Sequence, residues 1–222
     1  TAPADFTNTT QVSTDGITWV TAATATIPAG STFVFVRNPT LSKVKTRLAQ
    51  TLGNEKALEI YQKLLLHTNS VIIEVACDKF IFYTDYINEN DMWDATVYKK
   101  YLQTEGDLGN RITHAFEIVF TLGYQQVCIV GSDCNELTNT IITNAFAALQ
   151  TNDFVIGPST DGGYYLLGMQ QLLHPLFINI HWSTDVVLSQ TIHAIHNAEK
   201  TYFLLPALTD IDEEVNVPAE WL

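Results

Sequence analysis

The sequence predicts a three-layer α/β/α domain of the Rossmann-like type, with a mainly parallel central sheet. From Thr32 onward, short apolar runs alternate with amphipathic helical segments, which is the order of a parallel sheet covered on both faces. The apolar runs are short and continuous, as is typical of strands buried on both sides. A chain of 222 residues with 46% apolar content is also long enough to enclose a sizeable core.

The first half of this domain is expected to begin with a strand that ends at the loop Arg37-Asn38-Pro39. Gly53 is a natural end for the helix that follows this loop. We predict strands over residues 33–36, 71–76 and 79–83, and helices over residues 43–52 and 55–67.

The second half repeats the alternation. We predict helices over residues 107–122, 139–149 and 184–198, and strands over residues 127–130, 154–156, 164–167 and 201–205. In such sheets, ligands bind outside the carboxyl ends of the strands. The loops after Val36, Val130 and Ile156 are therefore the expected binding edge.

Residues 1–31 differ from the rest and are expected to form a threonine-rich, β-prone appendage to the domain of residues 32–222. This stretch has no lysine or arginine. Asp15-Gly16 lies between two β-prone arms, which is a typical hairpin signal.

The charge balance limits the classes of partner. Eleven lysines and arginines against 24 aspartates and glutamates give a formal net charge of −13, which argues against nucleic-acid polymers and anionic membrane surfaces. A metal-dependent enzyme with a small anionic substrate remains compatible, because a bound cation and a few basic residues can reverse the field in one cleft. No apolar run approaches the roughly 20 residues of a membrane-spanning helix, and no signal-peptide pattern is visible, so a cytoplasmic location is expected. Neither the oligomeric state nor the acceptor molecule can be read from the sequence.

Two acidic loops follow predicted strands. Asp133 comes directly after an apolar strand, with Gly131 permitting a tight exit, and its carboxylate could bind a hard cation such as Mg²⁺. Asp133 could equally be the N-cap of the next helix. In the second loop, Asp161 precedes Gly162 and Gly163, which would let a bound group approach the backbone, and Tyr164 offers a ring and a hydroxyl. A plain turn between two strands would explain this loop as well.

Basic residues are scarce, yet four of the eleven lie within residues 37–47. They are Arg37, Lys43, Lys45 and Arg47. Placed where the first strand ends and the first helix opens, they could bind phosphate together with free backbone N–H groups. An exposed helical turn is the alternative. Arg111 could be a second anion contact or an ordinary residue of a helix start.

Taken together, several segments resemble a known family, the small bacterial glycosyltransferase A-like proteins of GT-A fold. These proteins are related to the molybdenum-cofactor and phospholactate nucleotidyltransferases. The matching segments are Phe35-Val-Arg-Asn-Pro39, Lys43-Val-Lys-Thr-Arg-Leu48, Gly106-Asp-Leu-Gly-Asn-Arg111, Gly131-Ser-Asp-Cys134, Gly157-Pro-Ser-Thr-Asp-Gly-Gly-Tyr-Tyr-Leu-Leu-Gly168, Trp182-Ser-Thr184 and Asp210-Ile-Asp212. They cover about residues 32 to 213. At Ser42 the chain departs from the family, which usually has glycine there.

The resemblance implies a set of site residues. Nucleotide binding would fall to Arg37, Asn38, Lys43, Lys45, Arg47, Gly109, Arg111 and Ser132. The acceptor would be bound by Asp161, Gly162, Gly163, Tyr164 and Trp182. Mg²⁺ or Mn²⁺ would be held by Asp133, with Asp212 as its expected partner and Asp210 as the alternative.

The leading hypothesis is a metal-dependent glycosyltransferase with a nucleotide-sugar donor. Asp161 would orient or deprotonate the acceptor, and the cation together with Arg47 or Lys45 would stabilise the leaving diphosphate. A nucleotidyltransferase that releases pyrophosphate from a nucleoside triphosphate could use the same carboxylates and the same basic loop. A third reading is a non-catalytic binding module that retains the fold.

Overall fold

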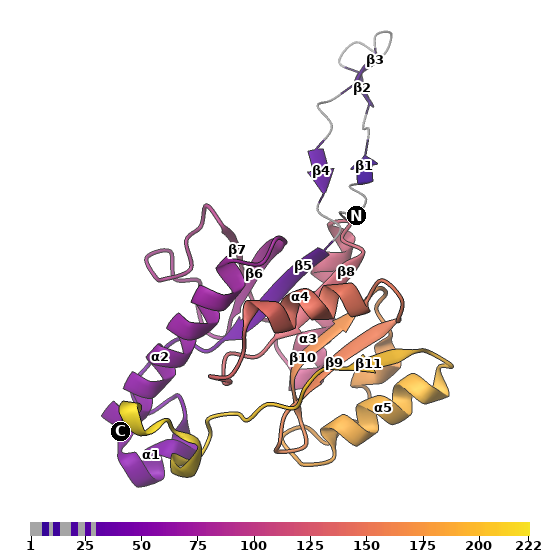
Figure 1. Ribbon diagram of the computed structural model, residues 1–222. Helices are drawn as coiled ribbons and strands as arrows, with labels where there is room; N and C mark the ends of the chain where they lie inside the picture. Colours follow the sequence, from indigo (N-terminus) through magenta and orange to yellow (C-terminus); the bar gives the residue numbers. More distant parts are fainter. Residues whose placement is uncertain (1–5, 9–10, 14–18, 22–24, 28–29) are drawn as a thin grey trace.

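The computed structural model describes residues 6–8, 11–13, 19–21, 25–27 and 30–222. Its centre is a seven-stranded sheet with the order β11-β9-β10-β8-β5-β6-β7 (Figure 1). The strands are β5 (Gly30–Val36), β6 (Asp78–Tyr83), β7 (Tyr98–Leu102), β8 (Gln126–Val130), β9 (Phe154–Pro158), β10 (Tyr164–Met169) and β11 (Tyr202–Leu204). Only β10 runs antiparallel to its neighbours in this sheet. The predicted mainly parallel sheet is therefore confirmed.

Helices cover both faces of the sheet (Figure 1). The helices are α1 (Thr46–Leu52), α2 (Asn54–Ile73), α3 (Leu108–Thr121), α4 (Asn139–Ala148) and α5 (Val187–Asn197), with short 3₁₀ helices η1 (His174–Phe177), η2 (Glu214–Asn216) and η3 (Ala219–Trp221). Of these, α1 packs against α2 and η2 and not against the sheet. Neighbouring residues of β5 point to opposite faces, as the period of a strand requires: Val34 packs with α2 and α4, and Phe33 packs with α3 and α5. This confirms the three-layer fold.

The apolar run at residues 71–76, predicted to be a strand, is the end of a helix. Helix α2 continues to Ile73, and Val71 and Ile72 are buried on the same side as Leu64 and Leu65. Seven-residue spacing keeps those pairs on one helix face, so the helix period explains the burial. Strand β7 was not predicted, because its sequence Tyr-Lys-Lys-Tyr-Leu is only partly apolar and it lies at the edge of the sheet.

Two short antiparallel pairs precede β5 and lie outside the seven-stranded sheet. They join β1 (Phe6–Asn8) to β4 (Ala25–Ile27), and β2 (Gln11–Ser13) to β3 (Trp19–Thr21). The pairing of β2 with β3 agrees with the expected hairpin, whereas its Asp15-Gly16 turn lies outside the described residues. The division of the chain into an appendage of residues 1–31 and a domain of residues 32–222 stays a prediction. Among the described residues, no helix is both long and apolar enough to cross a membrane.

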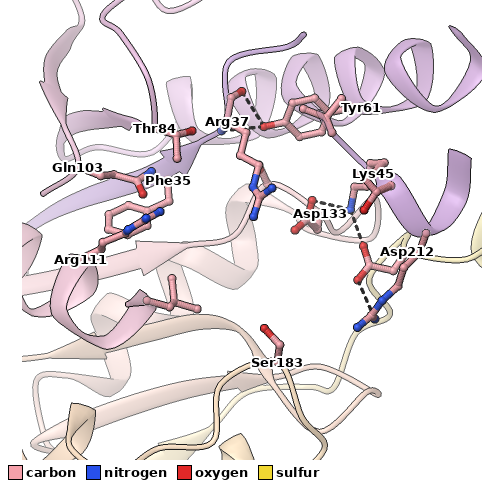
Figure 2. A pocket seen from close by; sticks show the side chains of 15 residues that line it. Phe35, Arg37, Lys45, Tyr61, Thr84, Gln103, Arg111, Asp133, Ser183 and Asp212 are labelled. Carbon is pink, nitrogen blue, oxygen red and sulfur yellow. Dashed lines mark hydrogen bonds and ion pairs between the residues drawn. The ribbon is translucent and has the colours of Figure 1, made fainter. Parts of the chain in front are cut away.

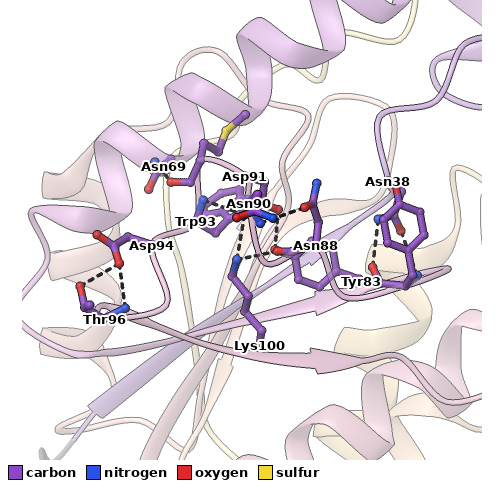
Figure 3. A network of polar contacts seen from close by, with 12 residues as sticks. Asn38, Asn69, Tyr83, Asn88, Asn90, Asp91, Trp93, Asp94, Thr96 and Lys100 are labelled. Atoms are coloured by element: carbon purple, nitrogen blue, oxygen red, sulfur yellow. Dashed lines mark hydrogen bonds and ion pairs between the residues drawn. The ribbon is translucent and has the colours of Figure 1, made fainter.

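A buried polar network fixes the loop between β6 and β7 (Figure 3). The Asp91 carboxylate accepts hydrogen bonds from the Tyr83 hydroxyl at 2.6 Å, from Lys100 Nζ at 2.9 Å and from the Trp93 backbone N–H at 3.1 Å. The lysine is only 5% exposed and the aspartate 17%. Because each charge has several partners, the Asp91–Lys100 pair can be buried without leaving an unpaired ion. These contacts stabilise the conformation of the loop between β6 and β7.

Candidate functional site

Two adjoining cavities open at the carboxyl ends of β5 and β8, at the edge that the sheet topology predicts. We call the first the basic cavity: its volume is about 390 Å³, and its basic lining residues are Arg37, Lys45, Arg47 and Arg111. We call the second the acidic cavity: its volume is about 530 Å³, and its acidic lining residues are Asp133, Asp161, Asp185, Asp210 and Asp212. The two share Phe35, Asp133 and Asp212 in their walls, so they form one continuous cleft.

Lys45 joins two carboxylates at the boundary between the cavities (Figure 2). Its Nζ lies 2.6 Å from Asp133 Oδ1 and 2.8 Å from Asp212 Oδ1, and its side chain is only 5% exposed. Burial alone would lower the pKa of Lys45, but the attraction of the two carboxylates outweighs it and the pKa is raised. A positive charge is therefore held between Asp133 and Asp212.

Asp133 and Asp212 meet because the chain pairs two distant segments. The backbone N–H of Ile211 donates to the carbonyl of Asp133 at 2.9 Å, and Cys134 and Asp210 form an antiparallel bridge. Ile211 is buried against α1 and α2, which fastens this segment to the domain. The predicted metal pair is thus brought to one place, although its metal-binding role stays a prediction.

The loop between β5 and α1 has an unusual backbone. Ser42 has a φ of 65° and Lys45 a φ of 46°, both in the left-handed region that favours glycine. The φ of Ser42 gives a physical reason for the glycine that the resembling family has at this position. Lys45 keeps this left-handed backbone conformation with its side chain ion-paired to two carboxylates. The ion pairs and the backbone conformation of the loop therefore stabilise each other. The helix predicted from residue 43 accordingly begins at Thr46.

The predicted nucleotide-binding residues fall into two groups. Arg37 extends into the basic cavity between Phe35 and Asp133 (Figure 2), and its backbone is fixed by the Tyr61 hydroxyl, which bonds both its N–H and its carbonyl at 3.0 Å. Arg47 also lines this cavity and lies 3.9 Å from Asp212 through Nη1. Arg111 and Ser132 line it as well. These four, with Lys45, are brought together as the sequence predicts.

The other three predicted residues, Asn38, Lys43 and Gly109, do not line the basic cavity. Asn38 is 2% exposed, and its side chain bonds the backbone of Asp85 and Tyr86, so it holds a loop. Lys43 and Asn38 line a side cavity of about 430 Å³, which shares Arg37, Thr46, Thr84 and Arg111 with the basic cavity. Gly109 is buried, and a Cβ there would lie 2.9 Å from Trp182 Nε1, which indicates a close-packing position.

The Asp161 loop is a tight turn built on side-chain hydrogen bonds. Asp161 Oδ1 accepts from the Ser159 hydroxyl and, at 2.9 Å, from the Gly163 backbone N–H. Gly162 has a φ of 90°, and a Cβ there would lie 2.2 Å from the carbonyl oxygen of Asp185. The turn is therefore pressed against the segment that leads into α5, as the turn interpretation expects. Gly162 lines neither cavity, and acceptor binding by this loop stays a prediction.

Among the other predicted acceptor residues, Gly163, Tyr164 and Trp182 line the acidic cavity. The Tyr164 hydroxyl is buried beside Thr191 of α5, and burial raises the pKa of this phenol. Tyr164 therefore offers its ring to the cavity wall, and its hydroxyl faces the protein interior. Asp210 also lines the cavity, and burial, followed by the nearby charges of Asp133 and Asp161, raises its pKa to about 7.

Several lining residues carried no signal in the sequence. Tyr61, Thr84 and Gln103 line the basic cavity, and Asp185 lines the acidic one. Thr84 and Gln103 directly follow β6 and β7. Because ligands bind outside the carboxyl ends of parallel strands, both residues could have been predicted if β7 had been recognised as a strand.

The donor set is compatible with a divalent cation. Among the described residues, no group of three or more His, Cys, Asp or Glu side chains converges as a complete metal site. However, Mg²⁺ commonly takes only one or two protein carboxylates together with substrate phosphates. Two carboxylates that already converge on the Lys45 ammonium provide hard oxygen ligands of this kind.

Comparison with known proteins gives a family and a fold. The model of the family described as uncharacterized protein conserved in bacteria (DUF2064) matches residues 68–184, more than half of the chain. None of the curated proteins matches the chain. A crystal structure of a candidate nucleotide-diphospho-sugar transferase from Desulfovibrio desulfuricans G20 is 29% identical, with 83% of each chain covered and a TM-score of 0.77.

More distant structures share the fold. Rv0371c from Mycobacterium tuberculosis H37Rv is 12% identical, with 85% of this chain and 95% of that chain covered and a TM-score of 0.54. The inositol-1-phosphate CTP transferase from T. maritima is 11% identical, with 86% and 92% covered and a TM-score of 0.50. The GT-A-like fold expected from the sequence is confirmed.

Proposed function

The chain belongs to the DUF2064 family, and we propose that it is a metal-dependent glycosyltransferase that uses a nucleotide-sugar donor. One observation carries this proposal: a cavity with four basic side chains adjoins one with five carboxylates, and Asp133 and Asp212 lie at their boundary. A nucleotide sugar has the matching polarity, because its diphosphate is anionic and its sugar is neutral. The relative with 29% identity, a candidate nucleotide-diphospho-sugar transferase, supports the same substrate class.

The donor would lie with its diphosphate in the basic cavity. Arg37, Arg47 and Arg111 provide planar donors suited to phosphate oxygens, and their charges would stabilise the negative charge that develops on the leaving diphosphate. Asp133 and Asp212 would hold Mg²⁺ or Mn²⁺, which supplies further charge neutralisation for the diphosphate when bound. Lys45 would then be free to contact phosphate in place of these carboxylates.

The transfer would occur where the two cavities meet. An acceptor hydroxyl attacks the anomeric carbon of the sugar, a new C–O bond forms, and the bond from this carbon to the diphosphate oxygen breaks. The electron pair of the broken bond stays on the diphosphate. The hydroxyl proton passes to a carboxylate, for which we propose Asp161, whose turn presents it at the wall of the acidic cavity.

The test is calorimetric titration of nucleoside diphosphates and nucleotide sugars with and without Mn²⁺. We expect Asp133→Asn to weaken the Mn²⁺-dependent component by about tenfold or more, because it removes one of two charged ligands. Asp153→Asn is the matched control, since Asp153 is paired with Lys200 away from the cleft and does not line either cavity. Unchanged binding in Asp133→Asn would overturn the proposed metal site.

The nucleotidyltransferase alternative has one specific observation in its favour. Four basic side chains around one cavity suit the higher charge of a nucleoside triphosphate. Mixing triphosphates with acceptors would release pyrophosphate under this alternative, whereas glycosyl transfer releases a nucleoside diphosphate. The identity of the released product therefore separates the two activities.

A further inference from the structure

The charge of the cleft changes sign between its two halves. The basic cavity has four cationic side chains against the carboxylates of Asp133 and Asp212. The acidic cavity has five carboxylates, and among its described lining residues Arg47 is the only cationic one. Arg47 also lines the basic cavity, where the diphosphate of the proposed donor would contact it, and it lies 3.9 Å from Asp212.

A bound donor does not reverse this difference. A divalent cation between Asp133 and Asp212 would offset those two carboxylates, but Asp161 and Asp185 would remain charged around the acidic cavity. Asp210, whose pKa is raised to about 7, would add a partial negative charge near neutral pH. The donor diphosphate would add further negative charge close by. An anionic group placed in this cavity would meet like charges from several sides, and like-charge contacts in a partly buried site are strongly unfavourable.

The same carboxylates suit a different ligand. An ionised carboxylate can only accept hydrogen bonds, so its partners must be donors such as hydroxyl groups. Asp161 uses Oδ1 for the Ser159 hydroxyl and the Gly163 N–H, which leaves the carboxylate facing the cavity with further acceptor capacity. Trp182 adds an aromatic wall against which the apolar face of a sugar ring could pack.

Accepting the proposed transferase function as its basis, we propose that the acidic cavity binds a polyhydroxyl acceptor that carries no phosphate or other anionic group. The acceptor presents its hydroxyls to the carboxylates of this cavity. Phosphate groups bind only on the basic side of the cleft. The same charges disfavour a nucleotidyltransferase reaction whose acceptor is a phosphorylated molecule.

Ligand-observed NMR can test this acceptor class. The wild-type protein would be saturated with Mn²⁺ and a nucleoside diphosphate, so that the basic cavity is filled. A panel of neutral hexosides and polyols would then be titrated, each beside its own phosphate monoester. We expect the best neutral compound to bind at least about tenfold more tightly than its phosphate ester.

A charge-reversal variant separates electrostatics from shape. Asp185→Lys places a cation in the acidic cavity and removes one acceptor carboxylate, so we expect the affinity for the phosphate ester to rise by about tenfold and that of the neutral compound to fall. Asp185→Asn should give a smaller rise in the same direction. Glu199→Lys is the control with the same change in net charge, because Glu199 follows α5 and lies outside both linings.

The outcomes are distinguishable. If nucleoside diphosphate binds but the phosphate ester binds as well as the neutral compound, or no neutral compound binds, the acceptor inference is overturned and the donor site stands. If nucleoside diphosphate does not bind with Mn²⁺, the proposed function fails, and the acceptor inference fails with it. A rise in phosphate affinity in Glu199→Lys equal to that in Asp185→Lys would also overturn the inference.

Discussion

The Lys45 ammonium lies 2.6 Å from the carboxylate of Asp133, in the position that a cation shared by Asp133 and Asp212 would need. A metal ion and this ammonium group therefore compete for the same two carboxylates. Binding of a cation has to be accompanied by movement of Lys45, and the basic cavity beside it offers phosphate as the new partner.

This competition predicts opposite effects of one substitution. In Lys45→Met no ammonium has to be displaced, so Mn²⁺ should bind about tenfold more tightly in the absence of nucleotide. Affinity for a nucleoside diphosphate with Mn²⁺ should fall, because one phosphate contact is lost. Electron paramagnetic resonance of free Mn²⁺ measures the first effect and calorimetry the second.

Lys43→Met is the matched control for the metal titration. It removes the same charge from the same loop, but Lys43 lines the side cavity and makes no contact with Asp133 or Asp212. Mn²⁺ affinity that is equal in Lys45→Met and the wild type would contradict the competition.

Local patterns were enough to predict most of the fold and one side of the cleft. Arg37 and Asp133 follow apolar strands, and the topology of a parallel sheet places the ends of such strands together. The run at residues 71–76 misled the prediction, because a short apolar stretch suits a buried strand and a helix end equally well.

Contacts between distant segments set the limit of such reasoning. The approach of Asp212 to Asp133 depends on the pairing of Ile211 with Asp133. These two segments are separated in the chain by α4, β9, β10, η1, α5 and β11. Asn38 shows the converse: its position in a basic loop suggests a ligand contact, yet its amide is buried against the loop after β6. No local pattern distinguishes these two uses of a polar side chain.

Gly162 should be essential to the acidic cavity. Gly162→Ala would place a Cβ 2.2 Å from the backbone of Asp185 at a φ of 90°, so the turn and the segment before α5 must separate. We expect a loss of stability of about 2 kcal/mol or more and weak binding of the neutral acceptor probes, with nucleotide affinity kept within about threefold. Chemical denaturation and calorimetry would measure the two effects.

Gly53→Ala provides the control for backbone strain alone. Gly53 has a φ of 83°, but a Cβ there would have no atom within 4 Å. Its loss of stability should therefore be smaller, about 1 kcal/mol, and acceptor binding should be unaffected. Equal effects of the two substitutions would show that contact with Asp185 is unimportant.

The Asp91–Lys100 pair should contribute strongly to stability. Lys100→Met leaves a largely buried carboxylate without its cation, and we expect a loss of about 3 kcal/mol in urea unfolding. Lys99→Met is the control on the adjacent residue, because Lys99 is 54% exposed and pairs with Asp78 at the surface, where the expected loss is below about 1 kcal/mol. A similar loss in both variants would contradict a special role for the buried pair.

Asp210 should make the stability of the metal-free protein depend on pH. Its pKa is raised to about 7 by burial and by Asp133, Asp161 and Asp212, with Lys45 opposing them, so the folded state holds a proton that the unfolded state has lost. Stability should therefore fall as pH rises from about 4 to about 7. Asp210→Asn cannot lose this proton, so its melting temperature in EDTA should exceed that of the wild type by more at pH 8 than at pH 5. A difference between the two proteins that is the same at both pH values would contradict the raised pKa.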